Sequence, residues 1–355
     1  MDKIKKLLFN PGPASVPRNI HEALLGEDIV HRGKEFEQLY RETSELVTKI
    51  LKGGDDYITL LITGSGTAAN EAMVSSFLLD QKVLVIRTDE FGDRLKAMCD
   101  IYEIKNWSLK FPKVIDLATV EKALHSNKEI NSILVPYVET AVGIQHPIKS
   151  LGKLLRLFYP RKINLYVDGV SAFASTKIDV IDENIAAITS SAGKCIMAFP
   201  GISFVCCQKE LFEYRGKKPQ NVYLDLHRAY QFYVNSYQAP NTPAIQLIQA
   251  FKKALEIYIK DEDAFIGNYI SNFNFLYREI KKIGFLPYVN NRQKLCNTTM
   301  IFYLPVDIQF DNFSSLLQDA GFIICSGKGK LKEQIFIVSV MGNRKKRTVK
   351  SLLIY

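Results

Sequence analysis

Residues 57–67 read Tyr-Ile-Thr-Leu-Leu-Ile-Thr-Gly-Ser-Gly-Thr. The first six form a compact, mostly apolar run that is typical of a buried β-strand. The glycine-rich turn after it leads into a helical pattern from about Ala68. A strand, a tight turn and a helix in this order form the repeating unit of an α/β sheet. The stretch therefore predicts a helix-covered sheet in the first part of the chain.

Similar apolar runs recur along the first two-thirds of the sequence, between stretches with helical patterns. They occupy residues 82–86, 133–138, 163–167, 186–189 and 202–207. Continuous apolar runs of this kind are typical of parallel strands that are buried on both faces. We therefore predict an α/β fold built on a mostly parallel sheet.

The pattern changes after a long helical region at about residues 242–260. Short strands are expected from there on, between helices, at residues 298–304, 322–325 and 335–340. This change predicts a smaller α+β domain. We place a large domain at residues 15–255 and the small domain at residues 1–14 together with 256–355.

Composition narrows the choice of partners. The 355-residue chain has a formal net charge of +9, yet only residues 343–347 form a dense basic run, and no nucleic-acid-binding motif accompanies it. A Lys-rich solvated surface is the simpler interpretation, although a preference for acidic substrates fits the charge as well. We expect no nucleic-acid partner. No apolar run reaches the ~18 residues that a membrane span needs, and the N-terminus has no apolar core of signal-peptide length.

Cysteine and histidine spacing argues against a metal site. The six cysteines contain no C-x-x-C pair, and the five histidines show no metal-binding spacing. Unpatterned cysteines in a chain of this length favour the reducing cytoplasm. The sequence therefore predicts a cytoplasmic protein without a structural metal.

The turn at residues 64–67 is the first of three polar features that follow predicted strands. Small residues at the start of a helix expose backbone N–H groups, which suits a phosphate. Gly64, Gly66 and Ala69 also match the G-x-G-x-x-A pattern of dinucleotide-binding proteins. A plain tight turn between a strand and a helix is an equally simple interpretation.

The second and third features are an acid and a lysine. Asp168 ends the run Tyr166-Val167-Asp168, and a carboxylate at the end of a buried strand is costly unless it is paired. Lys194 follows Ser190-Ser191-Ala192-Gly193, where desolvation would make its amine a usable nucleophile. Taken separately, Asp168 could be a helix cap or a salt-bridge partner, and Lys194 a surface lysine.

Together the three features predict a pyridoxal 5'-phosphate (PLP) site. The turn at residues 64–67 would hold the phosphate, and Asp168 would pair with the protonated pyridine nitrogen. Lys194 would bind the aldehyde. The carboxyl ends of parallel strands meet at one edge of a sheet, where such a ligand binds.

Several motifs resemble those of the class V, fold-type-I PLP-dependent aminotransferases over nearly the whole chain. The resemblance is strongest to the 2-aminoethylphosphonate–pyruvate transaminases, and residues 31–36 and 240–243 look like phosphoserine aminotransferases. It implies a seven-stranded, mostly parallel sheet in the large domain. The supporting motifs are Asn10-Pro11-Gly12-Pro13, Gly64-Ser65-Gly66-Thr67, Glu139-Thr140 with Gly143, Tyr166-Val167-Asp168, Ser190-Ser191-Ala192-Gly193-Lys194-Cys195 with Pro200-Gly201, and Ser326-Gly327-Lys328.

The resemblance also implies a role for each matching residue. Lys194 forms the Schiff base with PLP and shuttles the substrate proton, and Asp168 pairs with the ring nitrogen. Phe91 stacks on the ring, and Thr140 lies near the ring oxygen. The phosphate contacts are implied for Ser65, Gly66, Thr67 and Ser191, with Asn241 and Thr242 coming from a neighbouring subunit, so a homodimer with shared active sites is expected.

One position departs from the family pattern. The family usually has a carboxylate-binding arginine in the late strand, where this chain has Ile337. An apolar side chain cannot bind a carboxylate, so the acceptor and any α-amino acid donor need another cation. Arg32 with His31, or Arg344, are the candidates.

These observations predict an aminotransferase that moves an amino group from a small anionic amine, of the 2-aminoethylphosphonate type, to a 2-oxo acid such as pyruvate. Other interpretations remain open. They are a class V enzyme with another substrate, a lyase or a desulfurase that uses Cys325, a dehydrogenase based on the glycine pattern, and a PLP fold without activity.

Overall fold

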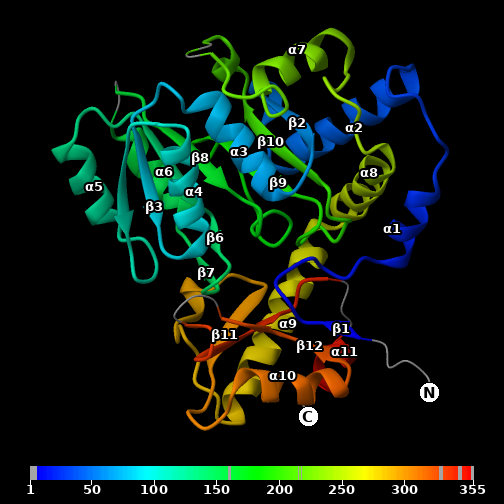
Figure 1. Cartoon of the computed structure of the whole chain (residues 1–355), viewed down its shortest axis with the longest axis vertical. Helices are drawn as coiled ribbons and strands as arrows, with labels where there is room; N and C mark the ends of the chain where they lie inside the picture. The colour runs from blue at the N-terminus through cyan, green and yellow to red at the C-terminus, as the bar shows by residue number, and fades with distance from the viewer. Residues whose placement is uncertain are drawn as a thin grey trace.

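The computed structural model describes residues 6–158, 161–214, 216, 218–327, 331–342 and 346–352. Figure 1 shows a helix-covered sheet in one part of the molecule and a smaller group of strands and helices in the other. The class predicted from the sequence, α/β with a mostly parallel seven-stranded sheet and a smaller α+β part, is confirmed.

The large sheet is built from seven strands in the order β2-β10-β9-β8-β5-β3-β4. β10 runs antiparallel to both of its neighbours, and the other described strands of the sheet run in one direction. The strands are β2 (Tyr57–Thr63), β3 (Val83–Arg87), β4 (Asn106–Lys110), β5 (Ser132–Pro136), β8 (Asn164–Asp168), β9 (Ile185–Ser191) and β10 (Ile202–Gln208).

Helices cover this sheet because their buried side chains repeat at helical spacing. In α2, for example, Phe36, Tyr40, Val47 and Ile50 are buried at intervals of three, four or seven residues, and the helix packs against β2 and α8. α3 contacts β9 and β10, whereas α4 contacts β3 and β5. The helices of this part are α1 (Arg18–Glu22), α2 (Lys34–Ile50), α3 (Gly66–Phe77), α4 (Glu90–Ile101), α5 (Leu117–Ser126), α6 (Ile148–Arg156), α7 (Leu226–Ser236) and α8 (Ile245–Lys260).

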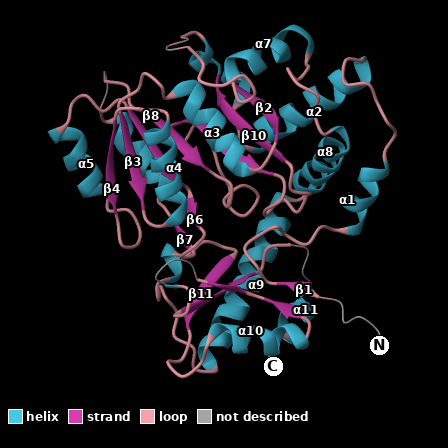
Figure 2. Ribbon diagram, viewed as in Figure 1, coloured by secondary structure: helices cyan, strands magenta, loops and turns pink. Residues whose placement is uncertain are grey.

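The smaller part follows α8 along the chain and is drawn below the large sheet in Figure 2. Its three-stranded sheet has the order β11-β14-β13, and β1 pairs in parallel with β12. The elements are β1 (Leu7–Leu8), α9 (Glu262–Lys282), β11 (Thr299–Tyr303), α10 (Phe310–Asp319), β12 (Phe322–Ile323), β13 (Cys325–Ser326), β14 (Ile335–Ser339) and α11 (Lys346–Ser351). The domain boundaries remain a proposal, which the pairing of β1 with β12 supports.

A short β-hairpin follows β5 in the chain. β6 (Val138–Glu139) pairs with β7 (Ile144–Gln145), and Tyr137 N–H donates to the carbonyl of Asp168 at 2.8 Å. Within the described residues, no helix has both the length and the apolar character needed to span a bilayer.

His146, directly after β7, is a buried histidine with an unusual environment. Thr88 Oγ1 lies 3.1 Å from His146 Nε2 and donates to the carbonyl of Lys113, whereas His146 Nδ1 has no partner among the described residues. Burial lowers the pKa of His146 to about 4. The folded chain therefore keeps this ring neutral at pH values where an exposed histidine is charged.

We expect His146→Asn to flatten the pH dependence of stability between about pH 6.5 and 4. In this range the unfolded wild-type chain binds a proton at residue 146 that the folded chain does not, so stability falls as the pH falls. A pKa of about 4 corresponds to a loss on the order of 3 kcal/mol by pH 4. Urea unfolding of variant and wild type across this range measures the difference. The exposed His125 gives the control variant, His125→Asn, and parallel curves for His146→Asn and wild type would contradict the expectation.

Candidate active site

The predicted site residues gather at the edge of the large sheet where β2, β3, β5, β8 and β9 have their carboxyl ends. The turn at residues 64–67 follows β2, and Phe91 lies just after β3. Thr140 follows the β5–β6 segment, Asp168 is the last residue of β8, and Lys194 comes three residues after β9. The parallel strands thus bring together residues that are far apart in sequence.

Asp168 is buried and strongly held in one orientation. Its Oδ1 accepts a hydrogen bond from Val170 N at 2.9 Å, and its Oδ2 accepts one from Asn70 Nδ2 at 2.7 Å. Burial raises the pKa of Asp168, while these two donors and the charges of Arg94 and Lys194 act to lower it. A buried carboxylate with this much desolvation is stabilised by a further positive partner.

Asn70 connects Asp168 to the next strand. Thr189 Oγ1 in β9 donates to Asn70 Oδ1, so the amide of Asn70 must point its Nδ2 toward Asp168. All three side chains are buried. The network fixes the direction in which the carboxylate faces.

Lys194 is half-buried beside the N-terminal segment of the chain. Its Nζ donates to the carbonyl of Pro11 at 2.7 Å, and Ala14 N donates to the carbonyl of Gly193 at 3.1 Å. Gly12 has a φ of +115°, and a Cβ atom there would lie 2.6 Å from Lys194 Nζ. The positive φ favours glycine at position 12, and the Lys194 side chain would have to shift to make room for a Cβ atom there.

The turn at residues 64–67 leads into α3, whose first N–H groups have no acceptor within the helix. Gly66 lies against Val170, since a Cβ atom on Gly66 would be 2.6 Å from Val170 Cγ2. The backbone of the turn thus packs beside the segment that follows Asp168. This places N–H donors suited to a phosphate next to the carboxylate.

Phe91 and Thr140 lie near these groups on two further elements. The guanidinium carbon of Arg94 lies 5.0 Å from the centre of the Phe91 ring, and Arg94 Nη1 donates to Thr67 Oγ1 at 3.2 Å. Thr140 is buried, and its Oγ1 donates to Ser171 Oγ at 2.7 Å.

Other predicted residues lie apart from this group within one chain. Asn241 Oδ1 accepts from Arg228 Nη1 at 3.2 Å, and Thr242 follows it in a loop beside the end of β2, where Ala244 N donates to Thr63 Oγ1. Arg32 joins this loop rather than Lys194, because its Nη1 donates to the carbonyl of Ala239 at 2.7 Å.

Of the remaining predicted residues, His31 is half-buried in the turn before α2, and Ser191 is the buried last residue of β9. Among the described residues, no side-chain hydrogen bond joins either of them to Asp168, Asn70 or Thr189. The roles of these residues and of the loop at 240–243 stay predictions.

The position of the missing arginine is apolar in the structure as well. Ile337 is buried in the middle of β14, where it packs with Ile301 and Ile335. Arg344, one candidate replacement, and Lys328 of the Ser326-Gly327-Lys328 motif lie outside the described residues.

The chemistry of these groups fits PLP. The first turn of α3 offers N–H donors for the phosphate, and Asp168 is a buried anion suited to a protonated pyridine nitrogen. Lys194 Nζ, at the same edge of the sheet, is the amine for the aldehyde. Lys194, Asp168, Gly66 and Thr67 are therefore the residues that would hold this cofactor.

Sequence reasoning missed Asn70, Arg94 and Ser171, and it did not assign a task to Glu139. Asn70 lies within α3 and Arg94 within α4, and neither belongs to a recognisable sequence pattern. Only the folded chain shows that Asn70 faces Asp168 and that Arg94 faces Thr67. A polar Asn70 among the small residues that open α3 was the one available signal.

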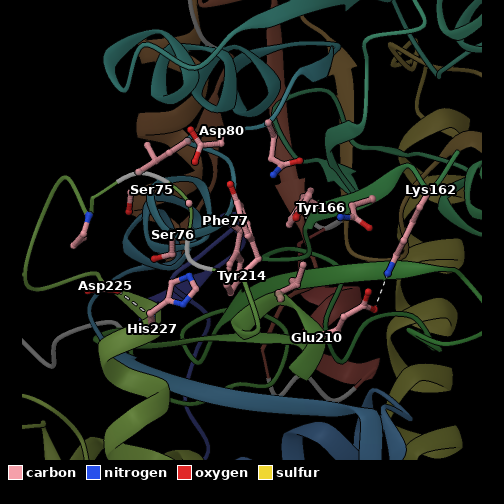
Figure 3. Close-up of a pocket in the computed structure, with 16 residues that line it drawn as sticks. Ser75, Ser76, Phe77, Asp80, Lys162, Tyr166, Glu210, Tyr214, Asp225 and His227 are labelled. Carbon is pink, nitrogen blue, oxygen red and sulfur yellow. Dashed lines mark hydrogen bonds and ion pairs between the residues drawn. The ribbon is translucent and has the colours of Figure 1, made fainter.

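A separate pocket, drawn in Figure 3, has both polar and apolar lining residues. Its cavity volume is about 190 Å³, and its lining includes Asp80 and Gln81 just before β3 and Asn164 at the start of β8. Lys162 pairs there with Glu210 at 2.7 Å. None of the residues described at the site around Lys194 lines this pocket, and the segments before β3 and β8 contribute to it, so the two are distinct.

Comparison with known families and proteins supports the same interpretation. The family model described as "Aminotransferase class-V" matches residues 7–338. A bifunctional phosphonoacetaldehyde hydrolase/aminoethylphosphonate transaminase from Clostridioides difficile (strain 630) is 30% identical over 331 residues, which is 91% of this chain. The match spans about half of that longer protein, 51% of its length.

Two further proteins extend the comparison. A 2-aminoethylphosphonate–pyruvate transaminase from Bacillus cereus (strain AH820) is 29% identical over 334 residues, covering 91% of this chain and 89% of its own. The structure of an alanine–glyoxylate aminotransferase from Nostoc sp. superposes with a TM-score of 0.92 at 22% identity, covering 100% of this chain and 95% of the other. At that identity the superposition shows a shared fold.

Proposed function

The chain belongs to the class V aminotransferases, and from this premise we propose that it transfers the amino group of a small anionic amine, of the 2-aminoethylphosphonate type, to a 2-oxo acid such as pyruvate. The arrangement of Lys194, Asp168 and the turn at residues 64–67 at one sheet edge carries the proposal of transamination. The names of the relatives from Clostridioides difficile and Bacillus cereus carry the choice of donor.

The cofactor of this family is PLP, which supplies an electron sink that stabilises negative charge on the carbon bearing the amino group. With the cofactor bound, Lys194 Nζ would act as the base that accepts the proton from that carbon and as the acid that later gives it up. Asp168, whose carboxylate Asn70 and Val170 hold in place, would keep a proton on the pyridine nitrogen. The first turn of α3 would bind the phosphate.

Ile337 supports a donor without a carboxylate group. A bidentate arginine is the usual partner of a substrate carboxylate, and the buried, apolar environment of Ile337 offers no such group. A phosphonate donor needs no carboxylate clamp at this position.

The acceptor has a carboxylate, and we assign its recognition to Arg32 together with His31. Arg32 is bonded to Ala239, next to the loop that carries Asn241 and Thr242. We propose a homodimer in which this loop reaches the site of the neighbouring subunit, so that Arg32 approaches that site with it. A cytoplasmic location is proposed from the unpatterned cysteines.

A donor panel tests the proposal. We expect 2-aminoethylphosphonate to bleach the absorbance of the enzyme-bound cofactor at least about tenfold faster than L-alanine or L-phosphoserine, because Ile337 stands where an arginine would bind a donor carboxylate. Single-turnover absorbance measurements with each amine provide the rates, and pyruvate should then restore the absorbance. Faster conversion of L-alanine would contradict the donor class, and no conversion by any amine would contradict transamination.

A desulfurase reaction is not favoured. Such chemistry uses a cysteine on a mobile loop, whereas Cys325 is the first residue of β13 and lies opposite Ile337 in the sheet.

A further inference from the structure

Glu139 is a carboxylate with no exposed surface, placed beside the site without belonging to it. It is the last residue of β6. Its Oε1 accepts a hydrogen bond from Phe91 N at 3.1 Å. Its Oε2 accepts from Gly92 N at 3.1 Å and from Asp89 N at 3.3 Å.

These three donors belong to the start of α4. The first N–H groups of a helix have no acceptor within the helix, and a side chain at the N-cap usually provides one. Asp89, at the N-cap of α4, forms no such bond. A carboxylate from a different strand therefore performs the capping, at the helix end where negative charge is favourable.

Burying this carboxylate is costly. Burial raises the pKa of Glu139 to about 7, although the N–H groups of Phe91, Gly92 and Asp89 act to lower it. Asp89, a second acid nearby, raises it further. An apolar side chain at position 139 would avoid this cost, so the carboxylate is expected to have a task that an apolar side chain cannot perform.

The backbone that Glu139 binds includes Phe91, the aromatic residue proposed for the cofactor site. Phe91 is one of its three donors, and Arg94, one turn later, packs on the Phe91 ring and donates to Thr67. On the other side, Thr140 directly follows Glu139 and donates to Ser171. The consecutive residues Glu139 and Thr140 thus bind two different sides of the site, one at Phe91 and the other at Ser171.

We propose that Glu139 is a positioning residue of the cofactor site, which clamps the first turn of α4 so that Phe91 is held where it contacts PLP. Glu139 itself does not touch the cofactor. It acts through Phe91, and it thereby sets the affinity of the enzyme for PLP. The inference rests on the proposed stacking role of Phe91.

A double-mutant cycle tests this mode of action. PLP affinity is measured by equilibrium dialysis of the cofactor-free enzyme for wild type, Glu139→Gln, Phe91→Leu and the double variant. Each single substitution is expected to weaken PLP binding about tenfold. If Glu139 acts through Phe91, the double variant also loses about tenfold, whereas independent roles give about a hundredfold. Unchanged affinity in Glu139→Gln, or the hundredfold loss, would overturn the proposal.

Glu183 provides a matched control. It is also buried, it accepts a hydrogen bond from Asp179 N at 3.3 Å, and burial raises its pKa to about 7. It precedes β9 and interacts with the Tyr137 side chain, two residues before Glu139, but no hydrogen bond in the described part of the chain joins it to the start of α4. Glu183→Gln should leave PLP affinity within about twofold of wild type, which separates a local effect from general loss of a buried acid.

Hydrogen exchange in the cofactor-free wild-type enzyme gives a second measurement that needs no variant. The amides of Phe91 and Gly92 should be protected as well as those in the middle of α4, since Glu139 binds them. Exchange at the rate of an open helix end would overturn the clamp even if Glu139→Gln does not fold. If Phe91→Leu alone leaves PLP affinity unchanged, the stacking role fails, and the proposed transamination is still judged by the donor panel.

Discussion

Lys194→Ala is expected to lower the rate of transamination by roughly 10⁴-fold. The substitution removes the amine that binds the cofactor aldehyde and the base that moves the substrate proton, and general-base catalysis alone accounts for up to about 10⁴-fold. The fold should tolerate the change, because Nζ makes its contact with a backbone carbonyl, that of Pro11, at the edge of the sheet. Stopped-flow absorbance with the best donor measures the rate.

Two controls make this result specific. Lys162→Ala removes a lysine that pairs with Glu210 in the separate pocket drawn in Figure 3, and it should keep the wild-type rate. Lys194→Arg keeps the charge and length of the side chain but is always protonated, so it should be as inactive as the alanine variant. More than about one hundredth of the wild-type rate in either Lys194 variant would exclude the assigned role.

Asp168→Asn is expected to lower the rate of transamination without lowering the stability of the fold. The amide keeps the shape of the side chain but has no charge to hold a proton on the pyridine nitrogen. Loss of one preorganised electrostatic contact typically costs on the order of 10²–10³-fold in rate, and we expect a loss of this size. Single-turnover rates at saturating donor measure it.

The same variant should be at least as stable as wild type without cofactor at pH 7. Burial raises the pKa of Asp168 above its unfolded value, so the stability it contributes is present at low pH and is lost as the pH rises through the folded pKa. Replacing the acid removes this cost. The network can adapt, because Asn70 can turn its amide and Thr189 can then donate to the carbonyl of Val167.

Urea unfolding of the two cofactor-free proteins at pH 7 measures this difference. Asp116→Asn, at the exposed N-cap of α5, serves as the control, since Asn and Asp cap helices equally well. A large loss of stability in Asp168→Asn would show that the charge itself holds the fold.

The sequence predicted the strands that are buried on both faces, because only these form continuous apolar runs. β2, β8 and β10 lie within a residue of the expected ranges. β4 was not predicted, since it lies at the edge of the sheet and its residues from Asn106 to Leu109 are only partly buried. An edge strand lacks the uniform apolar character on which the prediction depends.

The sequence predicted that Asp168 and Lys194 lie at the carboxyl ends of strands, and the structure places them there. The site was not predictable where a side chain acts across the fold. Asn70 reaches Asp168 from α3, and Glu139 binds the backbone of α4. The sequence does not indicate which helix packs beside which strand, so such contacts become visible only in three dimensions.

The N-terminal segment has a consequence for how the protein is made. Pro11 and Gly12 enclose Lys194, while β1 pairs with β12, and Phe9 accepts a hydrogen bond from Ser339 N at 2.7 Å. These partners in the smaller part follow the segment by more than 300 residues in the sequence, so they are synthesised well after it. The segment around Lys194 therefore cannot take its final place before β12 and β14 have been synthesised, and a contact of such high sequence separation forms late and slowly. Catalytic competence should accordingly be gained only after these two strands have left the ribosome.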